Sequence, residues 1–457
     1  MISGLKNIWL VLLAAIVAAH TFILTKLIFF PYPEFFVYPY LTNNGLLPYK
    51  QILDQHFPGL MFFPVNLGNL GMQDAQDARL WSAGIVVLIH ILLFFIGRKI
   101  FNSEKKALLG NLIFLVWQPF FEGWVLWIDS FLPLFLLPAF YFSYLAREKG
   151  WPKYLLLAGL FFGIALLFKQ VVFPLAALVA VALYIKRRKL VEVVWFGVAL
   201  APLPLLMVAY FWKIGVFQDF WYWTITYNLT VFADYGMKAP FASGVVRVVA
   251  VFGMVFFSWF HKQRSLAFWI TLFLLGSLAA AYSRFDFVHF QPALPFVVLG
   301  TVLALDWLWK NTRTRFIVGV YIAGIIFFLS IFYRGHLGEE VLFFDETTHL
   351  VAEKIMEETN HGEHIFIYGP SPHLYQMSGT LPAGDIYIQQ FSWFLMVSED
   401  LILTSLKTDS PDLVVADRTM SVDGQNLVEF SPKINSYLLE NYITIDIIGN
   451  TEFLNKK

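Results

Sequence analysis

The chain is 457 residues long, 58% of its residues are apolar, and only 14% are charged. Soluble domains average about 25% charged residues, so this composition excludes a wholly soluble or disordered protein and a nucleic-acid partner. It indicates a polytopic membrane protein. Cysteine is absent, which excludes a disulfide framework, a thiolate zinc site and a cysteine nucleophile.

The net charge of zero conceals an asymmetry along the chain. From Arg334 onward there are 7 Lys+Arg and 19 Asp+Glu residues, whereas residues 1–333 carry an excess of 12 positive charges. The break coincides with the end of the apolar runs. We therefore expect a membrane domain at 1–333 and an acidic soluble domain at 334–457.

Apolar runs that approach the roughly 20 residues needed to cross a bilayer as a helix recur through the first domain. We predict about eleven spans, near residues 7–30, 79–97, 107–125, 130–146, 154–168, 171–185, 190–212, 243–260, 265–281, 291–309 and 316–333. The first run is longer than the core of a signal peptide, so we expect an uncleaved span. The two short runs at 154–168 and 171–185 leave an alternative, a single merged helix, which would reverse the orientation of every later loop.

The loops between these runs alternate in charge. One set is short and, together with Lys6, holds 17 basic residues; it lies at 98–106, 147–153, 186–189, 261–264 and 310–315. By the positive-inside rule, this set and the N-terminus are cytoplasmic. The domain at 334–457 is then expected on the extracytoplasmic side.

The ionisable residues of the other loops gather at the outer ends of the predicted spans. The first external loop, at 31–78, is long, aromatic and rich in proline, and it carries Glu34. A transport path would place such groups near the bilayer midplane. Their position therefore favours a reaction or a binding event at the level of the outer headgroups.

The residue types at these outer ends suit a lipid phosphate as substrate. Cationic side chains can hold a phosphate, and those available are Lys169, Arg284 and His289. Carboxylates can act as a general base or hold a metal, and the candidates are Glu34 and Asp129.

Each of these residues also has a purely structural alternative. For Glu34 it is a solvated loop acid, and for His289 a packed histidine at the membrane interface. Asp129 has the residue type and position of a helix N-cap. Lys169 has the long side chain that allows a cation to extend to the membrane interface. Arg284 and Asp286 are close enough in sequence to pair with each other.

Several segments, in this order along the chain, resemble the GT-C membrane glycosyltransferases. The resemblance is to the dolichyl-phosphate-mannose protein mannosyltransferase-like (family 39-like) and Rgt-type bacterial branch. It is carried by Pro33-Glu34-Phe35, by Gly45-Leu46-Leu47-Pro48-Tyr49, by His56-Phe57-Pro58, by Phe168-Lys169-Gln170 and by RFDFVHFQPALP at 284–295. The family loop usually begins with two adjacent acids, whereas here Pro33 stands in the first position. If that acid is indispensable, the chain is inactive or works differently.

The resemblance implies an inverting hexosyl- or pentosyltransferase of the plasma membrane. Its donor would be a polyprenyl-phosphate sugar, and its acceptor a lipid, a protein or a polysaccharide. In these terms the catalytic residues are Glu34 and Asp129, the donor phosphate contacts are Lys169, Arg284 and His289, and His56 and Tyr49 shape the loop or contact the acceptor. No cofactor is demanded, and a divalent metal is left open. The alternatives are a transporter or flippase of lipid-linked sugars and a non-catalytic relative.

The acidic domain reads as a small α/β domain. Helical spacing covers 345–358, short apolar strands are expected at 364–368, 413–416 and 442–448, and Ser431-Pro432 is a favourable helix start. No catalytic constellation is evident in it. Two roles are consistent with this sequence, a cap over the membrane domain and a module that recruits the acceptor.

Overall fold

The computed structural model describes residues 2–369 and 371–457, without the side chains of residues 2–7, 186 and 187. Three bases counted toward the cytoplasmic loops, Lys6, Lys186 and Arg187, therefore lie outside the described side chains. The chain folds into two compact units, each built from three stretches. The first unit comprises the chain up to Phe29, Arg79–Val208 and Lys238–Glu340, and the second comprises Phe30–Ala78, Ala209–Met237 and Val341–Lys457.

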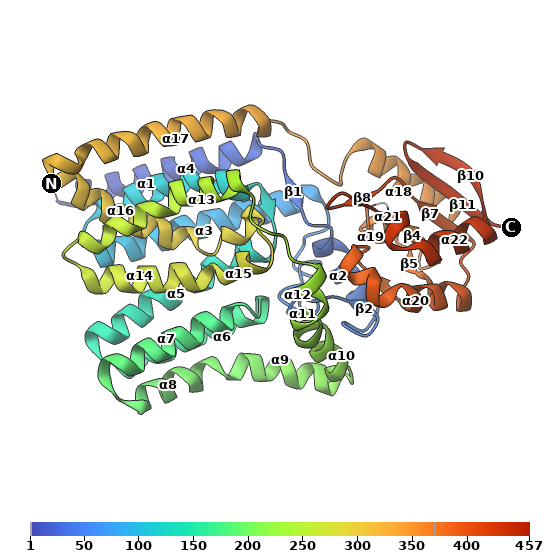
Figure 1. The fold of residues 1–457 in the computed structure, drawn as a ribbon, viewed down its shortest axis with the longest axis horizontal. Helices are drawn as coiled ribbons and strands as arrows, with labels where there is room; N and C mark the ends of the chain where they lie inside the picture. The colour runs from blue at the N-terminus through green and yellow to red at the C-terminus, as the bar shows by residue number, and fades with distance from the viewer. Residues whose placement is uncertain (1, 370) are drawn as a thin grey trace. The chain divides into compact units, whose positions relative to one another are not determined.

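The first unit is helical, and many of its long helices run alongside one another (Figure 1). Its elements are α1 (Ile2–Thr25), α3 (Ala75–Phe101), α4 (Glu104–Gln118), η1 (Pro119–Gly123), β3 (Val125–Leu126), α5 (Ile128–Lys149), α6 (Pro152–Phe168), α7 (Val172–Arg187), α8 (Leu190–Leu200), α9 (Pro202–Lys213), α13 (Ala242–Phe252), η3 (Gly253–Phe260), α14 (Arg264–Ser277), α15 (Ala279–Ser283), η4 (Phe287–Phe290), α16 (Leu294–Lys310), η5 (Thr312–Thr314) and α17 (Arg315–His336). The last residues of α9 belong to the second unit, as do the first residues of α3.

Most of every run expected as a span is helical in this structure, although the runs at 7–30 and 107–125 end in non-helical residues. Within the described residues, 6 helices are long and apolar enough to cross a membrane. The pair α8 and α9, bent by 41°, would make a seventh, and α6 and α7 are shorter apolar helices. The alternative of one merged helix is wrong, because a turn at Lys169 separates α6 from α7. The count of eleven spans and their orientation stay predictions.

Helix α6 packs closely on α8 through two glycines one turn apart. A Cβ atom at Gly159 would collide with the carbonyl oxygen of Phe196, and one at Gly163 would come within 2.6 Å of the carbonyl oxygen of Leu200. Small residues at this spacing let helix backbones approach each other in a membrane. The contact helps to fix the end of α6, which is followed directly by Lys169.

The second unit contains a mixed five-stranded sheet in the order β10-β11-β7-β4-β5. Its strands are β4 (His364–Tyr368), β5 (Leu381–Pro382), β7 (Leu413–Ala416), β10 (Tyr442–Ile448) and β11 (Thr451–Lys456). Strand β4 is parallel to both of its neighbours, and β11 is antiparallel to both of its own. The strands expected from the sequence are thus present as β4, β7 and β10, and the expected helix is α18 (Glu346–Glu358).

The first external loop belongs to this same unit and pairs directly with the C-terminal part of the chain. Strand β2 (Ile52–Leu53) runs parallel to β6 (Tyr387–Ile388), and the N–H of Tyr387 donates to the carbonyl oxygen of Gln51 at 2.7 Å. The other elements of the unit are β1 (Phe30–Pro31), α2 (Glu34–Asn43), α10 (Phe217–Trp221), η2 (Tyr222–Thr226), α11 (Tyr227–Leu229), α12 (Val231–Tyr235), α19 (Leu374–Ser378), η6 (Ala383–Asp385), α20 (Ser392–Thr408), β8 (Ser421–Val422), β9 (Gln425–Asn426), α21 (Leu427–Phe430) and α22 (Pro432–Asn441). The sequence analysis divided the chain at a single point, whereas this unit is assembled from three separate stretches.

Candidate active site

Three of the residues singled out from the sequence meet in the first unit around one carboxylate oxygen. Oδ2 of Asp129 accepts from Nζ of Lys169 at 2.6 Å and lies 2.8 Å from Nδ1 of His289. The Lys169 and His289 nitrogens are 3.3 Å apart. Asp129 is fully buried, and its Oδ1 accepts no hydrogen bond from the described residues. Of the two carboxylate oxygens of Asp129, Oδ2 thus has two hydrogen-bonding partners, whereas Oδ1 has none among the described residues.

The proton positions in this cluster follow from the chemistry of its partners. Asp129 offers only acceptors and a lysine ammonium only donors, so Nδ1 of His289 carries a proton and donates it to Asp129. Burial, together with the nearby Lys169 ammonium, lowers the pKa of His289 below its ordinary value. The imidazole is then neutral at pH 7, and its Nε2 keeps a lone pair.

The structure decides between the structural alternatives for these residues. The N-cap alternative for Asp129 is wrong, because the N-cap of α5 is Trp127 and Asp129 lies inside the first turn. Lys169 does not extend toward solvent; its side chain is only 8% exposed and pairs with Asp129. A buried ion pair of this kind is costly to break and is retained where its geometry matters.

Arg284 does not join this cluster. Its Nε donates to Oδ2 of Asp286 at 3.2 Å, and Oδ1 of Asp286 accepts from Nζ of Lys238 at 2.6 Å. Although burial alone would raise it, these two cations hold the pKa of Asp286 below its ordinary value. The pairing of Arg284 with Asp286 was one of the alternatives drawn from the sequence, and it is confirmed.

The segment that carries His289 is held by two side-chain contacts that the sequence analysis did not identify. Oε2 of Glu122 accepts from the backbone N–H of Val288 at 2.8 Å. Nε2 of Gln291 donates to the carbonyl oxygens of Gln118, at 3.2 Å, and of Phe121. Glu122 is itself in the left-handed region, with φ 57°. Both flanks of His289 are thus tied to the turn η1.

The other candidate acid, Glu34, lies in the second unit. It occupies the first turn of α2, which begins directly after Pro33, and its side chain is buried. Its Oε2 accepts no hydrogen bond from the described residues. Burial, assisted by the charge of Asp54 and partly offset by a backbone hydrogen bond, raises the pKa of Glu34 to about 8. An unsatisfied buried carboxyl costs free energy, which is typical of a functional site.

The two loop residues proposed to shape the site lie beside Asp54. Oδ1 of Asp54 accepts from the backbone N–H of His56 at 2.7 Å and lies 2.9 Å from its Nδ1. The hydroxyl of Tyr49 donates to the carbonyl oxygen of His56 at 2.9 Å. Tyr49 is fully buried, and its ring also packs against Phe211 and Phe220. The roles of Tyr49 and His56 toward an acceptor stay predictions.

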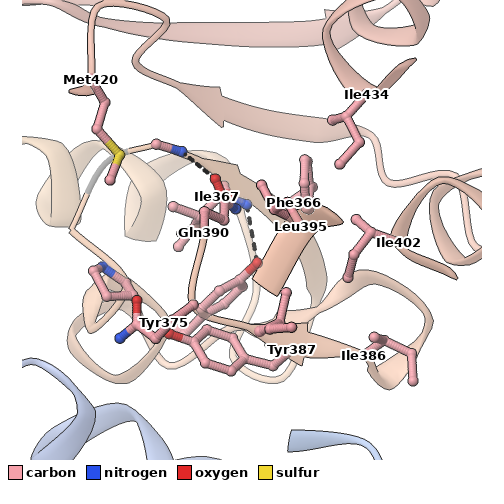
Figure 2. Close-up of a pocket in the computed structure, with 14 residues that line it drawn as sticks. Phe366, Ile367, Tyr375, Ile386, Tyr387, Gln390, Leu395, Ile402, Met420 and Ile434 are labelled. Carbon is pink, nitrogen blue, oxygen red and sulfur yellow. Dashed lines mark hydrogen bonds between the residues drawn. The ribbon is translucent and has the colours of Figure 1, made fainter. Parts of the chain in front are cut away.

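A small cavity in the second unit lies next to β4 and is lined mainly by apolar side chains (Figure 2). Its polar wall is internally bonded, since the N–H of Ile367 donates to the hydroxyl of Tyr375 at 3.0 Å and the N–H of Gly369 donates to Oε1 of Gln390 at 2.8 Å. Its volume of about 40 Å³ is small beside that of typical ligand pockets.

The described residues offer no ready-made metal site. They contain no group of three or more His, Cys, Asp or Glu side chains arranged to hold an ion. Asp129 and Glu34 each have one unsatisfied oxygen, and the partners of the other Asp129 oxygen are Lys169 and His289.

A further polar group, which the sequence analysis did not anticipate, lies among the apolar helices of the first unit. Nδ1 of His20 is 2.8 Å from Nε2 of His90, and Nδ1 of His90 is 2.7 Å from Oδ1 of Asn111. Nε2 of His20 is 3.0 Å from Oε1 of Gln118. All four side chains are buried. Single polar residues in apolar runs far apart in the sequence gave no signal that they would meet.

Comparison with known proteins agrees with the resemblance seen in the sequence. The family model described as dolichyl-phosphate-mannose-protein mannosyltransferase matches residues 58–212. No curated protein matches the chain.

Solved structures match over nearly the whole chain. ArnT from Cupriavidus metallidurans in the apo state is 12% identical, with a TM-score of 0.65, and the match covers 98% of each chain. The same enzyme bound to undecaprenyl phosphate gives a TM-score of 0.59, covering 98% of this chain and 97% of that one. The oligosaccharyltransferase of Archaeoglobus fulgidus, tethered to an acceptor peptide, gives 0.55 at 12% identity, covering 97% of this chain and 74% of that one. The chain therefore shares its fold with these solved structures.

Proposed function

We propose that this protein transfers a sugar from a polyprenyl-phosphate donor to an acceptor at the outer face of the plasma membrane, with inversion at the anomeric carbon. The observation that carries the proposal is the carboxyl of Glu34, which is buried and has one oxygen without a partner among the described residues. The hydroxyl of an acceptor would donate a hydrogen bond to that oxygen. A buried carboxylate base could serve many reactions, and the likeness to GT-C glycosyltransferases favours sugar transfer among them.

In this mechanism the ionised Glu34 takes the proton of the acceptor hydroxyl while the hydroxyl oxygen bonds to the anomeric carbon. The bond from the anomeric carbon to the phosphate oxygen breaks, and the phosphate leaves with the electron pair. Because that phosphate is already stable as an anion, no general acid is needed. A raised pKa makes the ionised Glu34 a stronger base than an ordinary glutamate.

The Asp129 cluster is proposed to hold the donor phosphate. Asp129 uses one of the three N–H donors of Lys169 and fixes the ring of His289. The remaining N–H groups of Lys169 are then oriented for phosphate oxygens, and they stabilise the charge that develops on the leaving group. Arg284, which is paired with Asp286, is proposed to add positive charge at a greater distance from the phosphate.

The test is incubation of the purified protein with polyprenyl-phosphate sugars that carry a labelled sugar. Release of polyprenyl phosphate together with labelling of an acceptor supports the proposal. Movement of intact donor between the leaflets of a vesicle, without cleavage, would instead support a flippase. Neither cleavage nor movement with any donor would leave the non-catalytic alternative.

A further inference from the structure

The first external loop lacks one of the two adjacent acids that the GT-C resemblance leads one to expect, because Pro33 occupies that position. In the structure Pro33 directly precedes α2, and its φ of −55° suits a helix start. Pro33 therefore helps to start the helix and supplies no carboxylate. A second acid beside Glu34 would have to come from elsewhere in the loop.

Asp54, which follows β2 in the middle of the same loop, is held on the face of α2 that carries Glu34. Tyr38 lies one helical turn after Glu34, so the two side chains share one face of the helix. The Tyr38 hydroxyl donates to Oδ2 of Asp54 at 2.7 Å. All three side chains are buried, with Asp54 only 1% exposed.

Asp54 is also held from its other side. His56 supplies two contacts to Oδ1, from its backbone N–H and from its ring. With the hydroxyl of Tyr38, this makes three donors around one carboxylate, an arrangement suited to an ionised group. Glu34 has the opposite environment, a buried oxygen with no donor among the described residues.

The C-terminal part of the chain closes this group. Pairing of β6 with β2 places Tyr387 beside Tyr38, with ring centroids 5.9 Å apart and the rings nearly perpendicular. The hydroxyl of Tyr387 is buried and has no hydrogen-bond partner among the described residues. The charges of Glu34 and Asp54 both add to the burial that raises the pKa of this phenol well above its ordinary value, which places the hydroxyl near both acids.

We propose that Asp54 supplies the second acid of the loop and acts as a positioning residue that, through its fixed negative charge, keeps Glu34 a strong base. This inference rests on the proposed function for its catalytic meaning, but the pairing of the two carboxyls can be tested separately. The titratable groups that face the pair are Tyr38 from α2, His56 and Tyr49 from the loop, Tyr227 from α11 and Tyr387 from β6. The phenols, with their raised pKa values, stay neutral near pH 8, so Glu34 is the group that titrates there.

The experiment titrates the Glu34 carboxyl in the purified full-length protein by infrared difference spectroscopy. The C=O band that is absent in Glu34→Gln is assigned to Glu34. We expect a midpoint near pH 8 in the wild type. In Asp54→Asn we expect the midpoint to fall but to stay above the ordinary glutamate value, because a like charge has been removed while burial, the larger cause of the raised pKa, remains.

A matched control is available in the same unit. Asp409 is also a carboxylate paired with a histidine ring, 2.5 Å from Nδ1 of His364, and it does not contribute to the pKa of Glu34. Asp409→Asn should leave the Glu34 midpoint unchanged. If Asp54→Asn does not give monodisperse protein, Asp54→Ser removes the same charge with a smaller side chain. A midpoint in the Asp54 variant that equals the wild-type value overturns the inference.

Activity provides the second readout. The rate should rise with pH through the midpoint of Glu34 and level off above it, since the ionised form is the base. Asp54→Asn should shift this rise to lower pH and reduce kcat on the plateau by about 3- to 10-fold, with KM for the donor unchanged, because a weaker base is less effective. If the wild type does not cleave any donor, the proposed function fails, while the infrared titration still decides on the carboxyl pair.

Discussion

At the residue scale, Glu34 combines burial, a raised pKa and an oxygen with no partner. Glu34→Gln keeps the size and hydrogen-bonding capacity of the side chain but removes the base. We expect turnover of a polyprenyl-phosphate sugar to fall by about 10²–10⁴-fold, the usual contribution of a general base. Folding and membrane insertion should be intact, as judged by gel filtration in detergent.

The comparison variant is Asp129→Asn, which should reduce turnover less if Asp129 only orients Lys169 and His289. Turnover of Glu34→Gln within about threefold of wild type would show that Glu34 is not the base. Asp129 would then be the leading candidate for that role.

A second prediction at this scale concerns the buried pair of Asp129 and Lys169. Lys169→Met leaves a carboxylate buried without its main counter-charge, which should cost about 3–5 kcal/mol of stability. The double variant Lys169→Met/Asp129→Leu removes both charges and should recover most of this loss. Thermal unfolding followed by tryptophan fluorescence measures both variants. If the double variant is as unstable as the single one, the stability of the site does not depend on the charge pair.

The sequence identified the residues of this cluster but not their arrangement. Polar side chains after apolar runs are conspicuous, so Asp129, Lys169 and His289 could be selected one by one. They are separated by 40 and 120 residues, and their convergence on one oxygen depends on how the ends of different helices pack. Asp54 was not singled out in this aromatic, proline-rich loop, because its contacts with Tyr38 and His56 form only when the loop folds.

At the scale of elements, the helices follow from hydropathy, while the turns that position the site do not. The apolar run at 107–125 predicts one continuous helix, yet the structure breaks it after Gln118 into the turn η1. Phe121 and Glu122 leave helical geometry there, and nothing in their residue types demands it. The turn is held by contacts to Val288 and Gln291, which lie far along the chain and cannot be read from local sequence.

This turn makes a testable contribution to stability. Burial, chiefly, raises the pKa of Glu122 to about 7. An acid whose pKa is raised on folding disfavours the folded state once it must ionise: the cost is absent below the unfolded pKa and complete above the folded value. Glu122→Gln keeps an acceptor for the N–H of Val288 without the charge. We therefore expect the Tm of this variant to exceed that of the wild type by about 2–4 °C at pH 8.

At pH 4 the two proteins should unfold at nearly the same temperature, because Glu122 is then protonated in both the folded and the unfolded state. Glu122→Ala is the companion variant, since it loses the acceptor and should be less stable than Glu122→Gln at both pH values. An equal Tm for Glu122→Gln and wild type at pH 8 would contradict the prediction that a buried carboxylate destabilises this turn.

At the scale of the whole molecule, the sequence predicted the class of fold and missed the way its parts are assembled. Composition and the spacing of apolar runs predict a helical membrane protein, and the fold shared with the solved structures agrees with the resemblance drawn from the loop motifs. The boundary drawn between residues 333 and 334 follows a change in charge. The compact units instead join the first external loop and the segment at 209–237 to the C-terminal part. Charge composition reports solvent exposure and carries no information about such long-range pairing.

This assembly strengthens the prediction of topology. Because β2 of the first external loop pairs with β6 of the C-terminal part, both must lie on the same side of the membrane. The positive-inside rule assigns the loops at 98–106 and 310–315 to the cytoplasm, which puts that shared side outside. Alkaline phosphatase fused after Lys457 should therefore be active, and green fluorescent protein at the same place should be dark. A fusion made after Arg188 should show the reverse. Fluorescence after Lys457 would place the C-terminal part in the cytoplasm and, with it, Glu34 and the proposed reaction.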